Sequence, residues 1–178
     1  MTARAAPLLE TARLTLRPFR TTDLDGQAAA LADPDVVRYL GGTTMSREDA
    51  WRRMLCAPGM WTMLGYGYWA VERSDDGVWL GQIGFGDFKR DMEPSIEGLP
   101  EMGWIFGVQA QGQGYASEAA AAALRWADAT LAAPEIVAII DPDNAPSIRV
   151  AEKSGFGERS DARYRNETIL LFRRRAAA

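Results

Sequence analysis

Two closely spaced glycines, Gly112 and Gly114, stand directly before the alanine-rich stretch 115–127. Alanine runs favour a helix, and the backbone N–H groups at a helix start carry partial positive charge that attracts anions. Glycine lets a ligand approach the backbone closely, so consecutive amides can hold a diphosphate without a lysine. The spacing therefore predicts a phosphate-binding loop. A glycine-rich turn that only links a strand to a helix is the alternative at this point.

Two other phosphate-binding patterns fit the loop poorly. A P-loop needs a lysine followed by a hydroxyl residue, but Gln113 and Gly114 occupy those positions, which argues against nucleotide hydrolysis. The dinucleotide pattern needs a third glycine where Ser117 stands, and Asp141 lies farther along the chain than the acidic residue of that pattern. The order strand, Gln-x-x-Gly-x-Gly, helix, with Gln109 as its first residue, fits best.

Composition removes several kinds of catalytic site. The chain has one cysteine, Cys56, and no histidine, which excludes Cys/His zinc sites, Ser-His-Asp triads and Cys-His dyads, so we expect no metal. An intrachain disulfide is impossible, in agreement with a reducing compartment. The net charge of −4 argues against nucleic acid as a partner. We find no signal peptide and no run of about 18 apolar residues, and we expect a cytoplasmic protein that does not bind membranes.

The length and the order of the expected elements predict one domain, residues 1–178, of the mixed α/β class. A first strand over 13–19 precedes two short helices. A further helix begins at Ser46, which is followed by an acidic residue three positions later, as in a capping box. Proline and glycine interrupt helices, so this helix is expected to stop at Pro58 and Gly59.

The second half predicts a sheet with both antiparallel and parallel neighbours. A hairpin over 66–88 is followed by a strand over 101–108, a long helix and a buried strand over 136–140, which is the order of a parallel crossover. A helix capped by Asp143 or Asn144 and stopped at Gly155 follows, and a last hairpin closes the chain. We therefore expect helices on both faces of a mixed, mostly antiparallel sheet.

Three stretches, "EMGWIF", "QAQGQGYASEA" and "DPDNAPSIRVAEKSGF", follow one another in an order typical of one enzyme family. With them, and with the opening "LETARLTLRPFRTTDLDGQAAALADPDVVRYL", the chain resembles the GNAT family of acetyl-CoA-dependent N-acetyltransferases from about Leu9 to Phe172. It is most similar to the RimJ/RimL-like branch, whose members acetylate protein N-termini or small amines. The resemblance implies a GNAT-like single domain whose sheet has a splayed central strand pair.

The resemblance implies acetyl-CoA as cosubstrate, bound where the strands 101–108 and 136–140 separate. The pantetheine arm would use backbone groups of Phe106 and Val108, as an added strand does, and the Val108 N–H would also meet the oxyanion. Asn144 would contact the same arm, although an asparagine at this position is equally suited to cap the helix. The implied diphosphate cradle comprises the amides of Gln111, Gly112, Gln113, Gly114, Tyr115 and Ala116.

Acetyl transfer to an amine also needs a base and an acid. Because histidine is absent, a carboxylate acting through water is the candidate base. The resemblance assigns this role to Glu101, which is otherwise an ordinary charged residue at a strand end. Many relatives carry a tyrosine acid where this chain has Ala151. The resemblance suggests Ser147 instead, which could equally cap or orient, and Tyr115 and Tyr164 are further donors.

These expectations describe an acetyltransferase that moves the acetyl group of acetyl-CoA to a primary amine, either a protein N-terminal α-amine or a small-molecule amine. The chain lacks the activated nucleophile of a covalent route, so direct attack within a ternary complex is expected. A non-catalytic acyl-CoA-binding module is the alternative that the missing tyrosine favours, and a nicotinamide-dependent oxidoreductase is the other. The aromatic stretch 57–69 could form an apolar wall for the acceptor, and the acidic stretch 87–101 could attract a cationic amine. The sequence does not decide which stretch binds the acceptor. A homodimer is common in families that share this pattern.

Overall fold

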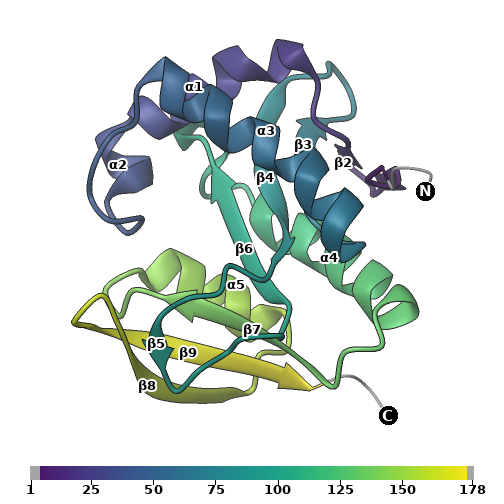
Figure 1. Cartoon of the computed structure of the whole chain (residues 1–178). Helices are drawn as coiled ribbons and strands as arrows, with labels where there is room; N and C mark the ends of the chain where they lie inside the picture. The colour runs from purple at the N-terminus through teal and green to yellow at the C-terminus, as the bar shows by residue number, and fades with distance from the viewer. Residues whose placement is uncertain (1–4, 176–178) are drawn as a thin grey trace.

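The computed structural model describes residues 5–175, which form a nine-stranded sheet in the order β1-β2-β3-β4-β6-β7-β9-β8-β5 (Figure 1). The strands are β1 (Leu9–Glu10), β2 (Leu14–Arg17), β3 (Tyr68–Arg73), β4 (Trp79–Gly86), β5 (Met92–Glu93), β6 (Glu101–Phe106), β7 (Glu135–Ile140), β8 (Glu158–Tyr164) and β9 (Glu167–Arg175). The helices are α1 (Leu24–Ala32), α2 (Pro34–Val37), α3 (Arg47–Leu64), α4 (Tyr115–Thr130) and α5 (Ala145–Lys153), with 3₁₀ turns η1 (Thr21–Asp23) and η2 (Val108–Ala110). Within this range no helix has the length and apolarity to cross a membrane.

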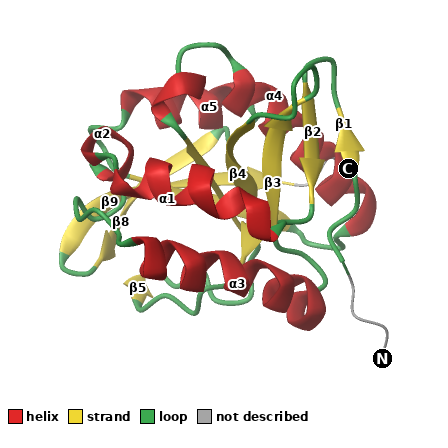
Figure 2. Ribbon diagram, turned by 90° about the horizontal axis from the view of Figure 1, so that it is seen from above, coloured by secondary structure: helices red, strands yellow, loops and turns green. Residues whose placement is uncertain are grey.

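One pair of neighbouring strands in the described sheet, β6 and β7, is parallel, and α4 makes the crossover between them. The other neighbours are antiparallel and include the two predicted hairpins, β3–β4 and β8–β9. Helices α1 and α4 both contact β4, and Figure 2 shows α1 and α3 on one side of β3 and β4, with α4 and α5 on the other. The predicted mixed α/β fold with helices on both faces is therefore confirmed.

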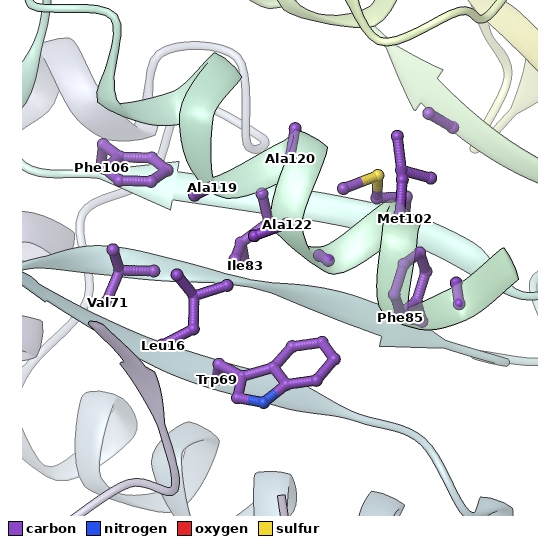
Figure 3. Packing of buried hydrophobic residues seen from close by; sticks show 14 of the residues in the cluster. Leu16, Trp69, Val71, Ile83, Phe85, Met102, Phe106, Ala119, Ala120 and Ala122 are labelled. Atoms are coloured by element: carbon purple, nitrogen blue, oxygen red, sulfur yellow. The ribbon is translucent and has the colours of Figure 1, made fainter. Parts of the chain in front are cut away.

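Small side chains let α4 pack closely on the sheet. Its buried alanines are Ala119, Ala120, Ala122, Ala123 and Ala127. They share the main core cluster with Ile83 and Phe85 of β4 and with Met102 and Phe106 of β6 (Figure 3). Because a buried alanine keeps the helix backbone close to the strands and has no side-chain rotamer freedom to lose, this packing holds the first turn of α4 near the end of β6.

The predicted end of α3 is wrong. Ser46 caps the helix as expected, because its Oγ accepts the Asp49 N–H at 3.1 Å, but α3 continues through Pro58 and ends at Gly65 in the left-handed conformation, φ +78°. Trp61 explains the difference. Its indole ring is buried, its Nε1 donates to the Tyr68 carbonyl at 3.0 Å, and it packs edge-on against the rings of Trp69 and Trp126. These tertiary contacts outweigh the local cost of a proline inside a helix.

The conflict at Pro58 predicts a stabilising substitution. Pro58 is exposed, so Pro58→Ala loses no core packing, and it restores an N–H that can donate to the carbonyl one turn earlier. We expect the free energy of unfolding to rise by about 1–3 kcal/mol, measured by urea denaturation.

Pro146→Ala is the matched control for this change. Pro146 is also exposed but lies in the first turn of α5, where proline is favourable. The control should therefore gain nothing. Equal stability changes in the two variants, or a loss in Pro58→Ala, would contradict this account of α3.

Candidate functional site

The sheet opens between its two central strands. β6 and β7 share one registered residue pair, Glu101 with Val137, and the Val137 N–H donates to the Pro100 carbonyl at 3.0 Å. Beyond this pair the strands run in clearly different directions, and Figure 1 shows β6 upright where β7 crosses the view. The predicted splayed strand pair is therefore confirmed, and most of β6 has an edge that β7 does not cover.

The register of β4 and β6 shows which backbone groups reach this open edge. The Gly107 N–H donates to the Leu80 carbonyl at 2.9 Å, so Gly107 points toward β4. In an antiparallel pair, alternate residues point toward the same edge. The backbone groups of Trp104 and Phe106 therefore point away from β4, into the opening. Val108 follows in η2 and is 46% exposed.

The predicted phosphate loop lies at the surface. Residues 111–114 are all exposed, and Gly112, with φ +72°, has no neighbouring atom within 4 Å of the position where a Cβ would be. Gly114, with φ +80°, is the residue before α4, and no side chain in the described range caps this helix. Tyr115 is buried and Ala116 is half-buried at the helix start. The first amides of a 16-residue helix are thus available to an anion.

A network that the sequence did not predict fixes this loop. The Glu118 carboxylate, in the first turn of α4, accepts from Thr11 Oγ1 at 2.7 Å and from Arg13 Nε at 2.7 Å. Arg13 also donates through Nη1 to the Gln113 carbonyl at 3.1 Å, and its guanidinium lies 4.6 Å from the centre of the Tyr115 ring. The network joins the end of the loop to the start of β2.

Charge balance is the second effect of this network. Burial alone would raise the pKa of Glu118, but the hydrogen bonds from Thr11 and Arg13 and the charge of Arg13 outweigh it and lower the pKa. Glu118 is therefore an ionised carboxylate at neutral pH, paired with a cation. This pairing offsets the repulsion that a carboxylate beside the loop would exert on a phosphate.

Asn144 and Ser147 meet at the start of α5. The Asn144 Oδ1 accepts the Ser147 N–H at 3.2 Å, so the predicted cap is confirmed. Across the opening, Trp104 Nε1 lies 3.3 Å from Ser147 Oγ. This contact brings the first turn of α5 to the side chain of a β6 residue, although 43 positions separate the two in the sequence.

Glu101 is buried, with 4% of its surface exposed, and forms a bidentate ion pair with Arg90. Arg90 Nε donates to one carboxylate oxygen at 2.5 Å and Nη2 donates to the other at 2.8 Å, while Nη1 donates to the Tyr164 hydroxyl at 2.9 Å. The guanidinium also lies 4.9 Å from the centre of the Phe88 ring. Burial acts to lower the pKa of Arg90, but its contacts with Glu101 outweigh this and raise it.

Glu101 and Ser147 lie on opposite faces of the sheet. Met102 and Phe106 of β6 belong to the core under α4, whereas Ile105 packs with residues of α1, α2 and α3. Side chains alternate along a strand, so Glu101 shares the face of Ile105, whereas Trp104, which reaches Ser147, shares the face of α4. The two predicted catalytic residues therefore approach the opening from different sides.

Tyr68 accompanies Glu101 on its face of the sheet. The Tyr68 hydroxyl lies 2.3 Å from the position where a Cβ of Gly103 would be, so this glycine makes room for the phenol ring. Burial raises the pKa of the Tyr68 hydroxyl, and the charge of Glu101 raises it further. Tyr68 is therefore a neutral hydroxyl at physiological pH.

A wide hollow borders this face and not the phosphate loop. Its volume is about 780 Å³, and it lies between residues 88–93 and 163–166, next to Arg90 and Tyr164. A second hollow of about 340 Å³ lies between α5 and the β8–β9 hairpin. A ligand that pairs with a strand edge lies along the surface and needs no enclosed cavity, so the position of the hollows does not conflict with a site at the loop.

The stretch 57–69 divides between core and surface. Trp61 and Trp69 are buried in the core, whereas Met63 is 85% exposed. In the acidic stretch, Asp87 and Glu97 both pair with Lys89, at 2.7 and 3.2 Å. The first stretch therefore forms no exposed aromatic cluster, and these two carboxylates of the second are already paired. The structure does not show which kind of acceptor either stretch would bind.

A family model and two curated relatives match most of this chain. Residues 13–157 match the family model described as "Acetyltransferase (GNAT) domain". The chain is 32% identical over 152 residues to the uncharacterized protein YkkB of Bacillus subtilis, covering 81% of each chain. It is 30% identical over 147 residues to the uncharacterized N-acetyltransferase YnaD of the same organism, covering 83% of this chain and 81% of YnaD.

Solved structures agree with this result. A protein of Bordetella pertussis assigned to the GNAT family of acetyltransferases superposes with a TM-score of 0.82 and 30% identity, covering 95% of this chain and 99% of that one. RimL, a ribosomal α-N-protein acetyltransferase in complex with coenzyme A, has a TM-score of 0.71 and 14% identity, covering 95% and 98%. At that identity the likeness to RimL shows a shared fold.

The buried ion pair predicts a large loss of stability when one partner is removed. Arg90→Met keeps much of the apolar stem but leaves the Glu101 carboxylate buried and unpaired, and we expect the free energy of unfolding to fall by about 3–5 kcal/mol. The double variant Arg90→Met/Glu101→Gln should lose less, because no buried charge is left without a partner. Urea denaturation measures all three proteins.

Arg52→Met is the control for the loss of an ion pair. Arg52 pairs with Glu48 on α3, and both side chains are 69% exposed. Its loss should cost less than about 1 kcal/mol. A cost as small in Arg90→Met would show that Glu101 does not depend on Arg90.

Proposed function

The chain belongs to the GNAT acetyltransferase family, and we propose that it transfers the acetyl group of acetyl-CoA to a primary amine, either a protein N-terminal α-amine or a small-molecule amine. The observation that carries this proposal is the opening between β6 and β7. An edge of β6 with free backbone groups leads through Val108 directly to the uncapped start of α4. An extended arm that ends in a diphosphate matches this order of an open strand edge followed by an anion site.

The residues at the opening fit coenzyme A in kind. Phe106 and Val108 would supply backbone groups to the pantetheine arm, and the Asn144 side chain, which caps α5, would lie beside the same arm. The space around Gly112, where a Cβ would meet nothing, leaves room for a diphosphate. The Gln111 N–H, predicted from the sequence to join this cradle, donates instead to the Val108 carbonyl at 3.1 Å. The amides that would hold the diphosphate are therefore those of Gly112, Gln113, Gly114, Tyr115 and Ala116. Acetyl-CoA would supply an activated acetyl thioester.

Glu101 is the proposed base for the acceptor amine. Each carboxylate oxygen has two lone pairs, and Arg90 uses one on each oxygen, so Glu101 can still accept a hydrogen bond from a water or from the amine. Arg90 and the hollow beside it lie on this side of the sheet. The amine would therefore approach the opening from the face that carries α1 and α3.

Ser147 is the proposed partner of the leaving sulfur, from the opposite face. The attacking amine forms the new C–N bond with its lone pair, the C–S bond breaks with its electron pair on sulfur, and the proton that nitrogen loses balances the one that sulfur gains. The backbone N–H of Val108 is the proposed donor to the oxyanion. No covalent bond to the protein forms in this direct transfer.

The branch and the location are parts of the same proposal. We assign the chain to the RimJ/RimL-like branch on the motifs 101–106, 109–119 and 141–156. A single cysteine leaves no intrachain disulfide, and we assign the reaction to a reducing compartment, the cytoplasm.

Binding of acetyl-CoA is the first test of this function. At a concentration 100 times its dissociation constant, acetyl-CoA should raise the melting temperature by about 5–10 °C. Gly112→Leu should abolish most of this rise, because the new side chain would occupy the open space before the amides. Differential scanning fluorimetry with and without the ligand measures both effects.

Gly77→Leu is the matched control for backbone strain. Gly77 has φ +70°, against +72° at Gly112, and its Cβ position is also open, but it lies in the β3–β4 turn. Both variants should lose similar stability, and Gly77→Leu should keep the full response to acetyl-CoA. If both keep it, the diphosphate does not bind at the loop.

Release of free thiol from acetyl-CoA, assayed with a panel of amines and N-terminal peptides, tests the chemistry. At least one amine should accelerate release, and Glu101→Gln should lower kcat about 100-fold. The defect should be largest at low pH and shrink as pH rises through the pKa of the amine, about 8 for an α-amine and 10.4 for lysine, because a neutral amine needs no base. Glu167→Gln, an exposed carboxylate on β9, is the control.

Two outcomes would overturn parts of this proposal. If acetyl-CoA binds and no amine accelerates thiol release, the chain is a binding module that lacks the reaction. If Glu101→Gln is folded and turns over at the rate of the unchanged protein at every pH, Glu101 is not the base.

A further inference from the structure

The contact between Trp104 and Ser147 is a side-chain hydrogen bond across the opening. Trp104 Nε1 lies 3.3 Å from Ser147 Oγ, and both side chains are half-buried. The Trp104 ring packs against the main core, which fixes its position on the α4 face of β6. The motif "EMGWIF" contains this tryptophan between Glu101 and Phe106, and the resemblance assigns roles to those two residues but none to Trp104.

Hydrogen-bond chemistry decides the direction of this contact. An indole N–H can only donate, so Ser147 Oγ is the acceptor. The Ser147 backbone N–H is bonded to Asn144 Oδ1. Among residues 5–175 no acceptor is bonded to the hydroxyl proton of Ser147. Trp104 occupies one lone pair of the Ser147 oxygen, so the hydroxyl keeps its proton and a second lone pair, and the proton is free to be donated to a ligand.

We propose that Trp104 is a positioning residue that aims the Ser147 hydroxyl at the sulfur of coenzyme A. This inference rests on the proposed function. The backbone of Trp104 faces the open edge along which the pantetheine arm would lie, and its side chain holds Ser147 beside the same edge. The Ser147 hydroxyl then donates a hydrogen bond to the sulfur as the C–S bond breaks, while the proton lost by the amine nitrogen restores the balance at the thiol.

A comparison of two ligands tests this inference without catalysis. Desulfo-coenzyme A lacks the sulfur atom and keeps the diphosphate and most of the arm. The unchanged protein should bind coenzyme A about tenfold more tightly than desulfo-coenzyme A, by the strength of one hydrogen bond. Trp104→Phe and Ser147→Ala should both lose this preference and keep their affinity for desulfo-coenzyme A. Isothermal titration calorimetry gives the dissociation constants.

A double-mutant cycle tests whether Trp104 acts through Ser147. Each single variant should lower kcat about tenfold with less than a twofold change in KM for acetyl-CoA. The double variant Trp104→Phe/Ser147→Ala should be no slower than Ser147→Ala, because the tryptophan has no hydroxyl left to orient. Ser147→Thr keeps a hydroxyl and should retain most of the activity and of the preference for coenzyme A.

Trp79→Phe is the control for the loss of an indole N–H. Trp79 Nε1 is buried and has no hydrogen-bond partner in the described part of the chain. This variant should change neither kcat nor the ligand preference. Melting temperatures of all variants show whether each is folded, and Phe at position 104 keeps an aromatic ring in the core.

The outcomes separate this inference from the proposed function. If the unchanged protein releases thiol with an amine and Trp104→Phe behaves like it in both assays, Trp104 has no positioning role. If Trp104→Phe and Ser147→Ala slow the reaction additively, the two act independently and the inference is wrong. If no amine is acetylated by the unchanged protein, the proposed function fails, and the preference for coenzyme A over desulfo-coenzyme A still tests the contact with sulfur.

Discussion

Unpaired backbone groups along one edge of β6 are the constraint on which the site depends. Buried N–H and C=O groups need partners, and β7 supplies them to β6 at one residue pair alone, Glu101 with Val137. The remaining groups on this edge must bond to water or to a ligand. The alanine packing of α4 then decides what lies at the far end of the edge, since it holds the first turn of that helix and its free amides close to the end of β6.

In the proposed reaction the sheet itself separates the two reactants. Glu101 lies on the face of α1 and α3, and Ser147 lies on the face of α4 and α5, so the acceptor and the thioester meet through the opening and not side by side on one surface. Direct transfer within a ternary complex suits this geometry, because neither reactant has to leave before the other binds. The hollow of about 780 Å³ beside Arg90 lies on the side from which the amine would approach.

Local patterns were sufficient for much of this structure. The caps at Ser46 and Asn144 and the glycine loop each follow from residues a few positions apart. The parallel crossover follows from the order of strand, helix and strand along the chain, and the family follows from the motifs. Pro58 shows the limit of local patterns. A proline does destabilise the helix, but this cost is smaller than the stabilisation from burying Trp61, whose partners come from β3 and α4. The balance between these two effects cannot be predicted from the sequence, because it depends on contacts between distant elements.

Long-range side-chain pairs were the part that could not be predicted. Arg13 and Glu118 are 105 positions apart and Trp104 and Ser147 are 43 apart, and neither pair has a spacing that any single element imposes. Glu101 was predicted as a site residue without its partner, since an arginine 11 positions earlier in a loop has no fixed distance to a strand. The residue types at the site could be predicted from the sequence, but their orientation relative to one another depends on the fold.

The single residue pair between β6 and β7 also gives the molecule a mechanical property. The two halves of the sheet are joined at the Glu101–Val137 pair, which can act as a hinge, and the hydrogen bond from Arg90 to Tyr164 links the halves beside it. Small changes in the angle between the halves break few backbone hydrogen bonds near the pivot. A pantetheine arm that bonded to the free edge of β6 and filled the space toward β7 would fix this angle. Ligand binding would therefore make the whole sheet more rigid.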